Sequence, residues 1–108
     1  MDVQLKKGLL DVCVLATLVK GDSYGWQVIK DLVDVIDISE STLYPILKRL
    51  EQSGGISTYE VPHNGRLRKY IKLTDIGRQR LEQFKQDSQG LRQIYDFIEN
   101  TLKEGDNE

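Results

Sequence analysis

Residues 39–51 read Ser-Glu-Ser-Thr-Leu-Tyr-Pro-Ile-Leu-Lys-Arg-Leu-Glu, and this stretch decides the fold. Ser39 is a good helix N-cap, and Glu40 in the first turn suits the helix dipole. Pro45 lacks a backbone donor and should bend the first turns, yet the apolar pattern continues through it without a phase break. Gly54-Gly55 is expected to end the helix. The apolar positions recur at the spacing of one buried helix face; they are Leu43, Ile46, Leu47 and Leu50.

The opposite face of this helix carries hydroxyl groups, an aromatic ring and basic side chains. Small side chains let a helix approach base edges in a major groove, and basic ones can meet phosphates or guanine. The sequence therefore predicts DNA contacts from this segment, made by Ser39, Ser41, Thr42, Tyr44, Lys48 and Arg49.

A β-hairpin is predicted directly after this helix. Two strand-like segments, Ile56–Val61 and Arg68–Thr74, flank His-Asn-Gly-Arg at 63–66, and Asn-Gly favours a tight turn with positive φ. Alternation places Ile71 and Leu73 on one face. The tip is basic and suits the DNA backbone or a narrow minor groove; the expected contacts are His63, Asn64, Arg66, Arg68 and Lys69. The alternative is a solvated hairpin whose charges prevent edge aggregation.

The segments on either side complete the fold. Helical spacing predicts a first helix over Val3–Lys20, stopped by Gly21, and a second from about Tyr24, capped by Ser23. A long last helix is predicted from Thr74 or Asp75 to about Lys103. The fold class is thus mainly α with a small β hairpin, and three helices, a hairpin and a helix form the order of a winged helix-turn-helix.

The last helix carries a heptad seam, with apolar residues spaced alternately three and four apart. Its positions are Leu81, Phe84, Ser88, Leu91, Tyr95, Ile98 and Leu102. We expect this seam to pack against a second copy, on the partner's first helix around Leu5 and Leu9. Burial within the same chain is the alternative. The predicted division is a DNA-binding domain over 1–74, a dimerisation helix over 75–104 and a frayed tail over 105–108.

The charge is unevenly distributed. The net charge is −2, but residues 39–80 carry eight basic and four acidic side chains, which leaves +4 there. The segments 1–38 and 81–108 carry −2 and −4. A basic middle explains how an acidic chain can bind nucleic acid.

Other function classes find little support. The chain lacks an apolar run of the length that a membrane span needs and a signal-peptide layout, so we expect a cytoplasmic protein. A single cysteine, Cys13, and a single histidine, His63, offer no metal or catalytic cluster. We therefore expect no enzyme activity, no metal and no cofactor. Cys13 is interpreted as a packing residue, and Trp26 as a core or helix-packing residue rather than a ligand platform.

The chain resembles the PadR-type transcriptional regulators in their short form, with one C-terminal helix. The resemblance covers about residues 5–103 and includes Pro45, which the family carries at this place. It departs at Leu67, where many members have proline. The matching motifs are Ser-Tyr-Gly-Trp-Gln-Val-Ile at 23–29, the quoted stretch at 39–51, Gly-Arg-Leu-Arg-Lys-Tyr at 65–70 and Leu-Thr-Asp-Ile-Gly at 73–77.

The resemblance implies a homodimeric transcription factor, usually a repressor, on a palindromic double-stranded operator. Tyr24 resembles a family position that touches the DNA backbone. Leu91 stands where drug-binding short members carry tryptophan, so no effector site of that kind is expected. The family's recognition residues correspond to Ser41, Thr42, Tyr44 and Lys48, with Arg66, Arg68 and Lys69 in the wing. The alternative is a winged helix that binds proteins, as an adaptor or anti-repressor, without DNA.

Overall fold

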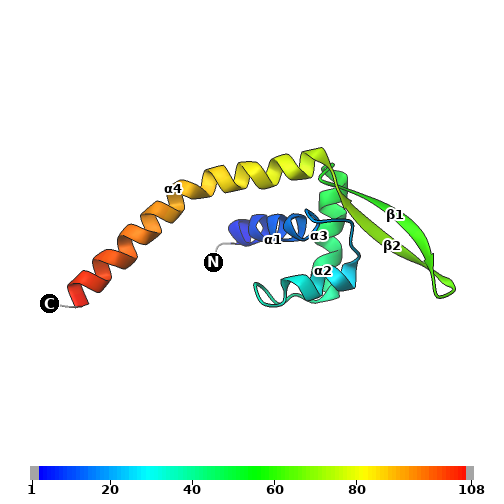
Figure 1. Ribbon diagram of the computed structural model, residues 1–108, viewed down its shortest axis with the longest axis horizontal. Helices are drawn as coiled ribbons and strands as arrows, with labels where there is room; N and C mark the ends of the chain where they lie inside the picture. Colours follow the sequence, from blue (N-terminus) through cyan, green and yellow to red (C-terminus); the bar gives the residue numbers. More distant parts are fainter. Residues whose placement is uncertain (1–2, 107–108) are drawn as a thin grey trace.

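The computed structural model describes the backbone of residues 3–106 and the side chains of residues 7–106. Six elements follow the predicted order (Figure 1): α1 Val3–Thr17, α2 Gly25–Leu32, α3 Glu40–Gln52, β1 Ile56–His63, β2 Arg66–Leu73 and α4 Asp75–Asp106. Helices α1 to α3 pack together, the β1–β2 hairpin extends from one end of them, and α4 runs out in the opposite direction. The fold class and the order expected from the sequence are confirmed.

The core lies where α1, α2 and α3 meet the base of the hairpin. The apolar face expected of α3 is largely buried, and Ile71 of β2 closes the core on the side of the hairpin. The largest fully enclosed side chains are Val14, Leu15, Val28, Leu43, Leu50 and Ile71. The third helix and the hairpin therefore start from a common, close-packed base, which fixes their relative positions.

The first helix is shorter than predicted, and the second has a different N-cap residue. Helix α1 ends at Thr17 rather than at Lys20. Tyr24, not Ser23, is the N-cap residue of α2, and its side chain makes no capping hydrogen bond. Ser23 instead forms a bridge to β2, in which its N–H donates to the Ile71 carbonyl over 3.0 Å and its carbonyl accepts from Ile71 N–H over 2.7 Å. The prediction of a Ser23 cap is wrong because this strand-like pairing holds its backbone.

Helix α3 begins and ends as its sequence indicates. The hydroxyl of Ser39 accepts from Thr42 N–H over 3.3 Å, which makes Ser39 the N-cap. The helix continues through Pro45 without interruption. Gly54 has a φ of 82°, and the Gly55 N–H donates back to the Leu50 carbonyl over 2.8 Å. This pattern is a Schellman motif, and it turns the chain from α3 directly into β1.

The hairpin is longer at its tip than predicted. Strand β1 continues to His63 and β2 starts at Arg66, so only Asn64 and Gly65 form the loop. Their φ values of 52° and 78° are those of a tight type I′ turn, which the Asn-Gly pair favours. Thr74 lies outside β2. Instead, its hydroxyl accepts from Gly77 N–H over 3.1 Å at the start of α4.

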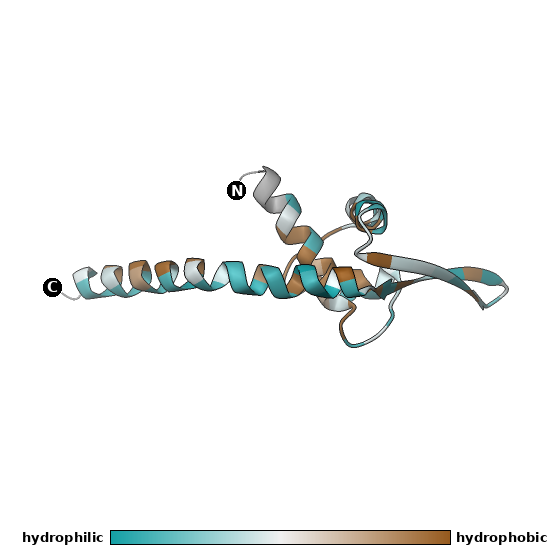
Figure 2. Cartoon of the chain, turned by 90° about the horizontal axis from the view of Figure 1, so that it is seen from above, coloured by the Kyte–Doolittle hydropathy of each residue, from teal (hydrophilic) through white to brown (hydrophobic). Residues whose placement is uncertain are grey.

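Helix α4 gives the molecule its elongated shape of 66 × 26 × 24 Å. It runs unbroken from Asp75 through Gly90 to Asp106, three residues beyond the predicted end at Lys103. Its first turns lie against the body of the protein, and the rest extends away (Figures 1 and 2). Among the described residues, no helix is both long and apolar enough to cross a membrane.

Candidate nucleic-acid interface

The outer face of α3 presents the predicted reading residues to solvent. Ser41, Thr42, Tyr44 and Lys48 are all exposed. Hydroxyls gather at the first turn, where Ser39 Oγ lies 2.9 Å from Ser41 Oγ and 3.3 Å from Thr42 Oγ1. Free N–H groups and the helix dipole make such a helix start suitable for a phosphate, and the hydroxyls add further donors. The face thus combines anion-binding groups with a lysine one turn beyond Tyr44.

Arg49 does not lie with these residues. Its Nη2 donates to Asp11 Oδ1 of α1 over 2.5 Å, and Asp11 is only 8% exposed. A charged group so deeply placed needs a partner, because an unpaired buried carboxylate is costly. The structure therefore gives Arg49 a partner within the protein and separates it from Lys48, although the two are adjacent in sequence.

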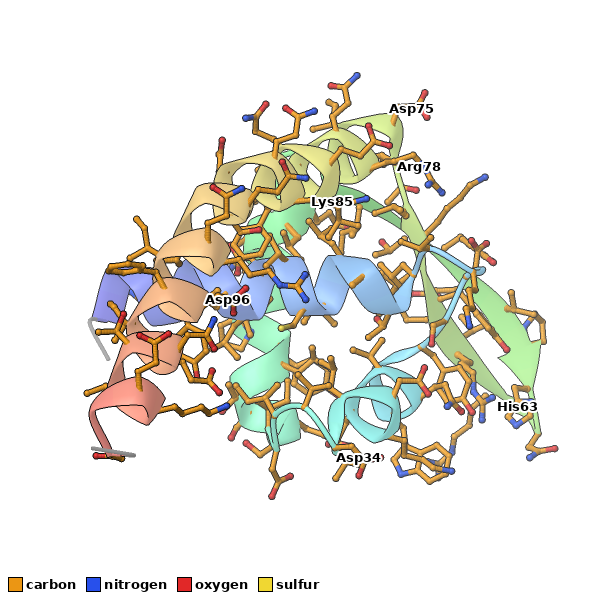
Figure 3. The ribbon with its side chains drawn as sticks, turned by 60° about the vertical axis from the view of Figure 1, so that its left-hand side comes forward. Asp34, His63, Asp75, Arg78, Lys85 and Asp96 are labelled. Atoms are coloured by element: carbon orange, nitrogen blue, oxygen red, sulfur yellow. The ribbon has the colours of Figure 1, made fainter. Side chains whose placement is uncertain are left out.

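The hairpin carries a second basic group of side chains, as predicted. His63, Asn64 and Arg66 are exposed around the turn, and Lys69 is exposed on β2. Arg68 is half-buried, because its guanidinium carbon lies 4.1 Å from the centroid of the Tyr24 ring. This cation–π contact joins β2 to the start of α2. Figure 3 shows His63 close to the tip of the hairpin.

A row of aromatic rings ties the hairpin to α2, and the sequence interpretation missed it. Tyr24 meets Tyr70 edge to face at a centroid distance of 5.8 Å, and Tyr70 stacks on Tyr59 at 5.6 Å. The Tyr59 hydroxyl donates to Asp22 over 2.6 Å, and this hydrogen bond raises the pKa of Tyr59. Strand alternation, which puts Tyr59 and Tyr70 opposite each other on one face, was the available signal.

Trp26 is not a core residue, so the sequence interpretation needs correction. It is 55% exposed on the outer side of α2, beyond the Tyr24 ring at a centroid distance of 6.5 Å. The Lys30 ammonium group lies 4.2 Å from its centroid. The indole lies outside because the buried face of α2 is formed by Val28 and Leu32 instead.

A cleft of about 490 Å³ joins α2, α3 and the hairpin. It collects five of the predicted DNA contacts, together with Trp26 and two glutamates. The predicted residues that line it are Tyr24, Tyr44, Lys48, Arg68 and Lys69. The two glutamates are Glu40 and Glu51. The side chains at the tip, His63, Asn64 and Arg66, lie around a separate shallow hollow with Leu67 and Arg68. The interface therefore has a central cleft and a distal basic tip.

The heptad seam on α4 divides into two parts. Leu81 packs against the core of its own chain, and Phe84 borders a hollow of about 370 Å³ that Leu9 of α1 also lines. Beyond them the seam is open: Leu91, Tyr95, Ile98 and Leu102 are 51–67% exposed. Figure 2 shows the corresponding apolar segments along the outer half of α4. The side chain of Leu5 lies outside the described residues. Only the start of the seam is thus used within the chain.

Other candidate chemistry is sparse in the structure. Cys13 is partly buried and packs against the core, which confirms its interpretation as a packing residue, and burial raises the pKa of its thiol. Within the part of the chain that the structure describes, His, Cys and carboxylate side chains form no group able to hold a metal ion. The concentrated features are therefore the cleft, the basic tip and the open seam.

Comparisons with known proteins match this geometry. The model of the transcriptional regulator PadR-like family matches residues 14–83. A crystal structure of a Streptococcus mutans protein is 38% identical, with a TM-score of 0.72, and the match covers 92% of this chain and 90% of that one. A PadR-like transcription factor from Bacteroides fragilis is 32% identical, with a TM-score of 0.78, over 88% of this chain and 94% of that one.

A third structure contains nucleic acid. It is Bacillus subtilis PadR in complex with operator DNA, which is 26% identical with a TM-score of 0.66 over 70% of this chain and 46% of that one. The family match spans the helices and the hairpin that build the cleft. The chain is therefore a member of the PadR-like family of transcriptional regulators.

Proposed function

We propose that the chain is a homodimeric repressor that binds a palindromic operator in the cytoplasm, with α3 in the major groove and the hairpin on the backbone or in the minor groove. The observation that carries this proposal is the exposed polar and basic face of α3 beside the basic hairpin, across one cleft. Such a pair of elements can reach bases and phosphates at once. Operator DNA bound to the Bacillus subtilis relative supports the same use of the fold here.

The proposed contacts follow from exposure. Ser41, Thr42, Tyr44 and Lys48 would approach base edges, while Ser39 mainly caps the helix. Arg68 and Tyr24, held together, would present a cation and a hydroxyl to the backbone. The tip residues His63, Asn64, Arg66 and Lys69 would follow the adjacent groove. Arg49 is left out because it is paired with Asp11.

Dimerisation is the second half of the proposal. A helix that leaves Leu91, Tyr95, Ile98 and Leu102 exposed along one stripe needs an apolar partner, and the first helix of a second copy is the surface expected to cover it. Pairing also doubles the DNA contact, since one such module buries too little surface for tight specific binding. Phe84 and Leu9 would extend the interface at its inner end, whereas Leu81 belongs to the core.

The test is selection of bound fragments from genomic DNA, followed by footprinting and transcription from the selected promoter. The expected result is a two-fold symmetric footprint, affinity that falls steeply with salt, and lower transcription when the protein is added. Absence of duplex binding at about 50 mM salt would overturn the DNA function and leave a protein-binding winged helix. An asymmetric footprint from a monomer would overturn the dimeric part alone.

A further inference from the structure

Asp11 is the one described carboxylate that joins three helices. It lies on α1, and its side chain is 11% exposed. One of its oxygens, Oδ1, accepts from Arg49 of α3 over 2.5 Å, and the other, Oδ2, lies 3.5 Å from Nη2 of Arg80 on α4. A single buried group thus contacts both the helix that faces the DNA and the helix that carries the open seam.

The attachment of α4 to the rest of the chain is confined to its first turns. Thr74 donates to the Gly54 carbonyl over 2.5 Å, Gly77 approaches Gly55 closely, and Leu81 packs on the core. After Phe84, nearly every described residue of the helix is exposed. Those remaining turns act as a lever of about 33 Å, so a rotation of about 10° at the base would move the far end by about 6 Å.

Arg80 makes the charged contact that resists such a rotation, next to the apolar packing of Leu81 and Phe84. Thr74 and Gly77 hold the start of α4 against the Gly54-Gly55 turn that follows α3, which makes that junction the point of rotation. The ion pair acts one turn further along, on the side of α4 that faces α1. Because the same carboxylate also holds Arg49, it links the angle of α4 to the position of α3.

We propose that Asp11 is a positioning residue that, through Arg49 and Arg80, sets the angle between α3 and α4 and so the operator half-site spacing that the dimer accepts. The inference rests on the proposed function, in which α4 joins two copies and α3 enters the DNA. In such a dimer, the distance between the two α3 helices depends on the angle between α3 and α4 within each copy. Half-site spacing in operators reflects that separation.

The test measures spacing selectivity rather than affinity alone. Arg80→Met removes the outer ion pair but leaves Arg49 to neutralise Asp11, so we expect the fold to be retained. Each protein is titrated with its selected operator and with the same operator carrying one extra central base pair, which shifts the half-sites by about 3.4 Å and 35°. Sedimentation at the same concentration confirms that each variant is a dimer.

Two further variants serve as matched controls. Arg80→Lys keeps a cation that can reach Asp11 and should retain most of the wild-type selectivity. Arg78→Met makes the same substitution two residues away, at an exposed position near the start of α4 and the base of the hairpin (Figure 3). Arg78 has no ion-pair partner among the described residues. Its loss can change affinity for both operators but leaves their ratio unchanged.

The expected outcome is a loss of discrimination. The wild type should bind the expanded operator at least about tenfold more weakly than the natural one. For Arg80→Met this difference in affinity should be about threefold or less, with nearly unchanged affinity for the natural spacing. Wild-type discrimination in Arg80→Met, or the same loss in Arg78→Met, would overturn this inference and leave the proposed function standing. A wild type that neither dimerises nor binds the operator would overturn both.

Discussion

At the scale of single residues, Lys48 and Arg49 show that neighbours in the sequence can lie in very different surroundings. Both are basic, and neither belongs to the apolar face of α3. Lys48 is exposed at the cleft, whereas Arg49 turns toward α1 and pairs with Asp11. One residue is therefore free to bind an anionic partner, and the other stabilises the packing of two helices.

Substitution of each by alanine should separate these roles. Lys48→Ala should weaken operator binding by about 1–3 kcal/mol, more for the specific site than for random DNA, and leave the melting temperature unchanged. Arg49→Ala should lower the free energy of unfolding, by about 3 kcal/mol in the deeply buried limit and by less here because its side chain is 42% exposed. Titration of DNA and denaturant unfolding check both. Equal effects of the two variants in either assay would contradict the assignment.

Two glycines of α4 should respond in opposite directions to alanine. A Cβ on Gly77 would collide with the Gly55 carbonyl oxygen, whereas a Cβ on Gly90 meets nothing within 4 Å. Gly77→Ala should therefore destabilise the fold by about 1–3 kcal/mol through overpacking. Gly90→Ala should raise helix stability by about 1 kcal/mol, because glycine is a poor helix former. Denaturant unfolding at one protein concentration measures the free energy of unfolding of both variants. An unchanged value for Gly77→Ala would show that α4 can move away from the Gly54-Gly55 turn.

At the scale of elements, the hairpin is held at its base and free at its tip. The Ser23 pairing with Ile71 holds its base. The Tyr59–Tyr70 stack and the Tyr24–Arg68 contact anchor its middle to the start of α2 and to the loop before it. The Asn64-Gly65 turn with Arg66 extends into solvent. Because most of the hairpin is already ordered, a cation at its tip can bind DNA with a smaller loss of conformational entropy.

Arg66→Ala should therefore weaken specific and non-specific DNA binding about equally. Removal of one phosphate contact should lower the slope of log affinity against log salt by about 1. Titrations at several salt concentrations, on operator and random duplexes, measure both quantities. Gln86→Ala, an exposed position on α4 away from the cleft, is the control and should change neither. A loss confined to the operator would instead assign Arg66 to base recognition.

At the scale of the whole molecule, the candidate DNA-binding surface and the open seam of α4 lie apart along one long axis. The cleft and the basic tip lie at one end, and the exposed seam of α4 lies toward the other (Figures 1 and 2). This separation lets the proposed dimer form on α4 without covering the face of α3. It also explains how a chain with a net charge of −2 can present a basic surface to a polyanion.

Breaking the seam should produce monomers. The double substitution Leu91→Glu and Ile98→Glu places charges on the exposed stripe and should abolish dimerisation, with operator affinity reduced about 100-fold or more as paired binding is lost. Phe97→Glu is the control, because Phe97 is 71% exposed but lies off the seam. Sedimentation and DNA titration provide the readouts. A double variant that remains dimeric would mean that another surface joins the copies.

The sequence by itself determined the elements, because the signals for them are local. Apolar spacing, the Ser39 cap, the Gly54-Gly55 stop and the Asn-Gly turn each act within a few residues, so the helices, the hairpin and the family motifs could be predicted. The ends of the helices were predicted less accurately. Helix α1 stops three residues early and α4 runs three residues longer, because helix ends depend on neighbouring groups.

Only the tertiary structure decided which side chains meet. Nothing local indicates that Ser23 pairs with β2 rather than capping α2, that Arg49 reaches an aspartate 38 positions away, or that Trp26 lies outside. These contacts join residues far apart in the chain, and packing of the whole core selects them. The heptad seam depended on both sequence and tertiary structure. Its spacing predicted an apolar stripe, and the packing showed that Leu81 lies against the core while the seam from Leu91 onward is exposed.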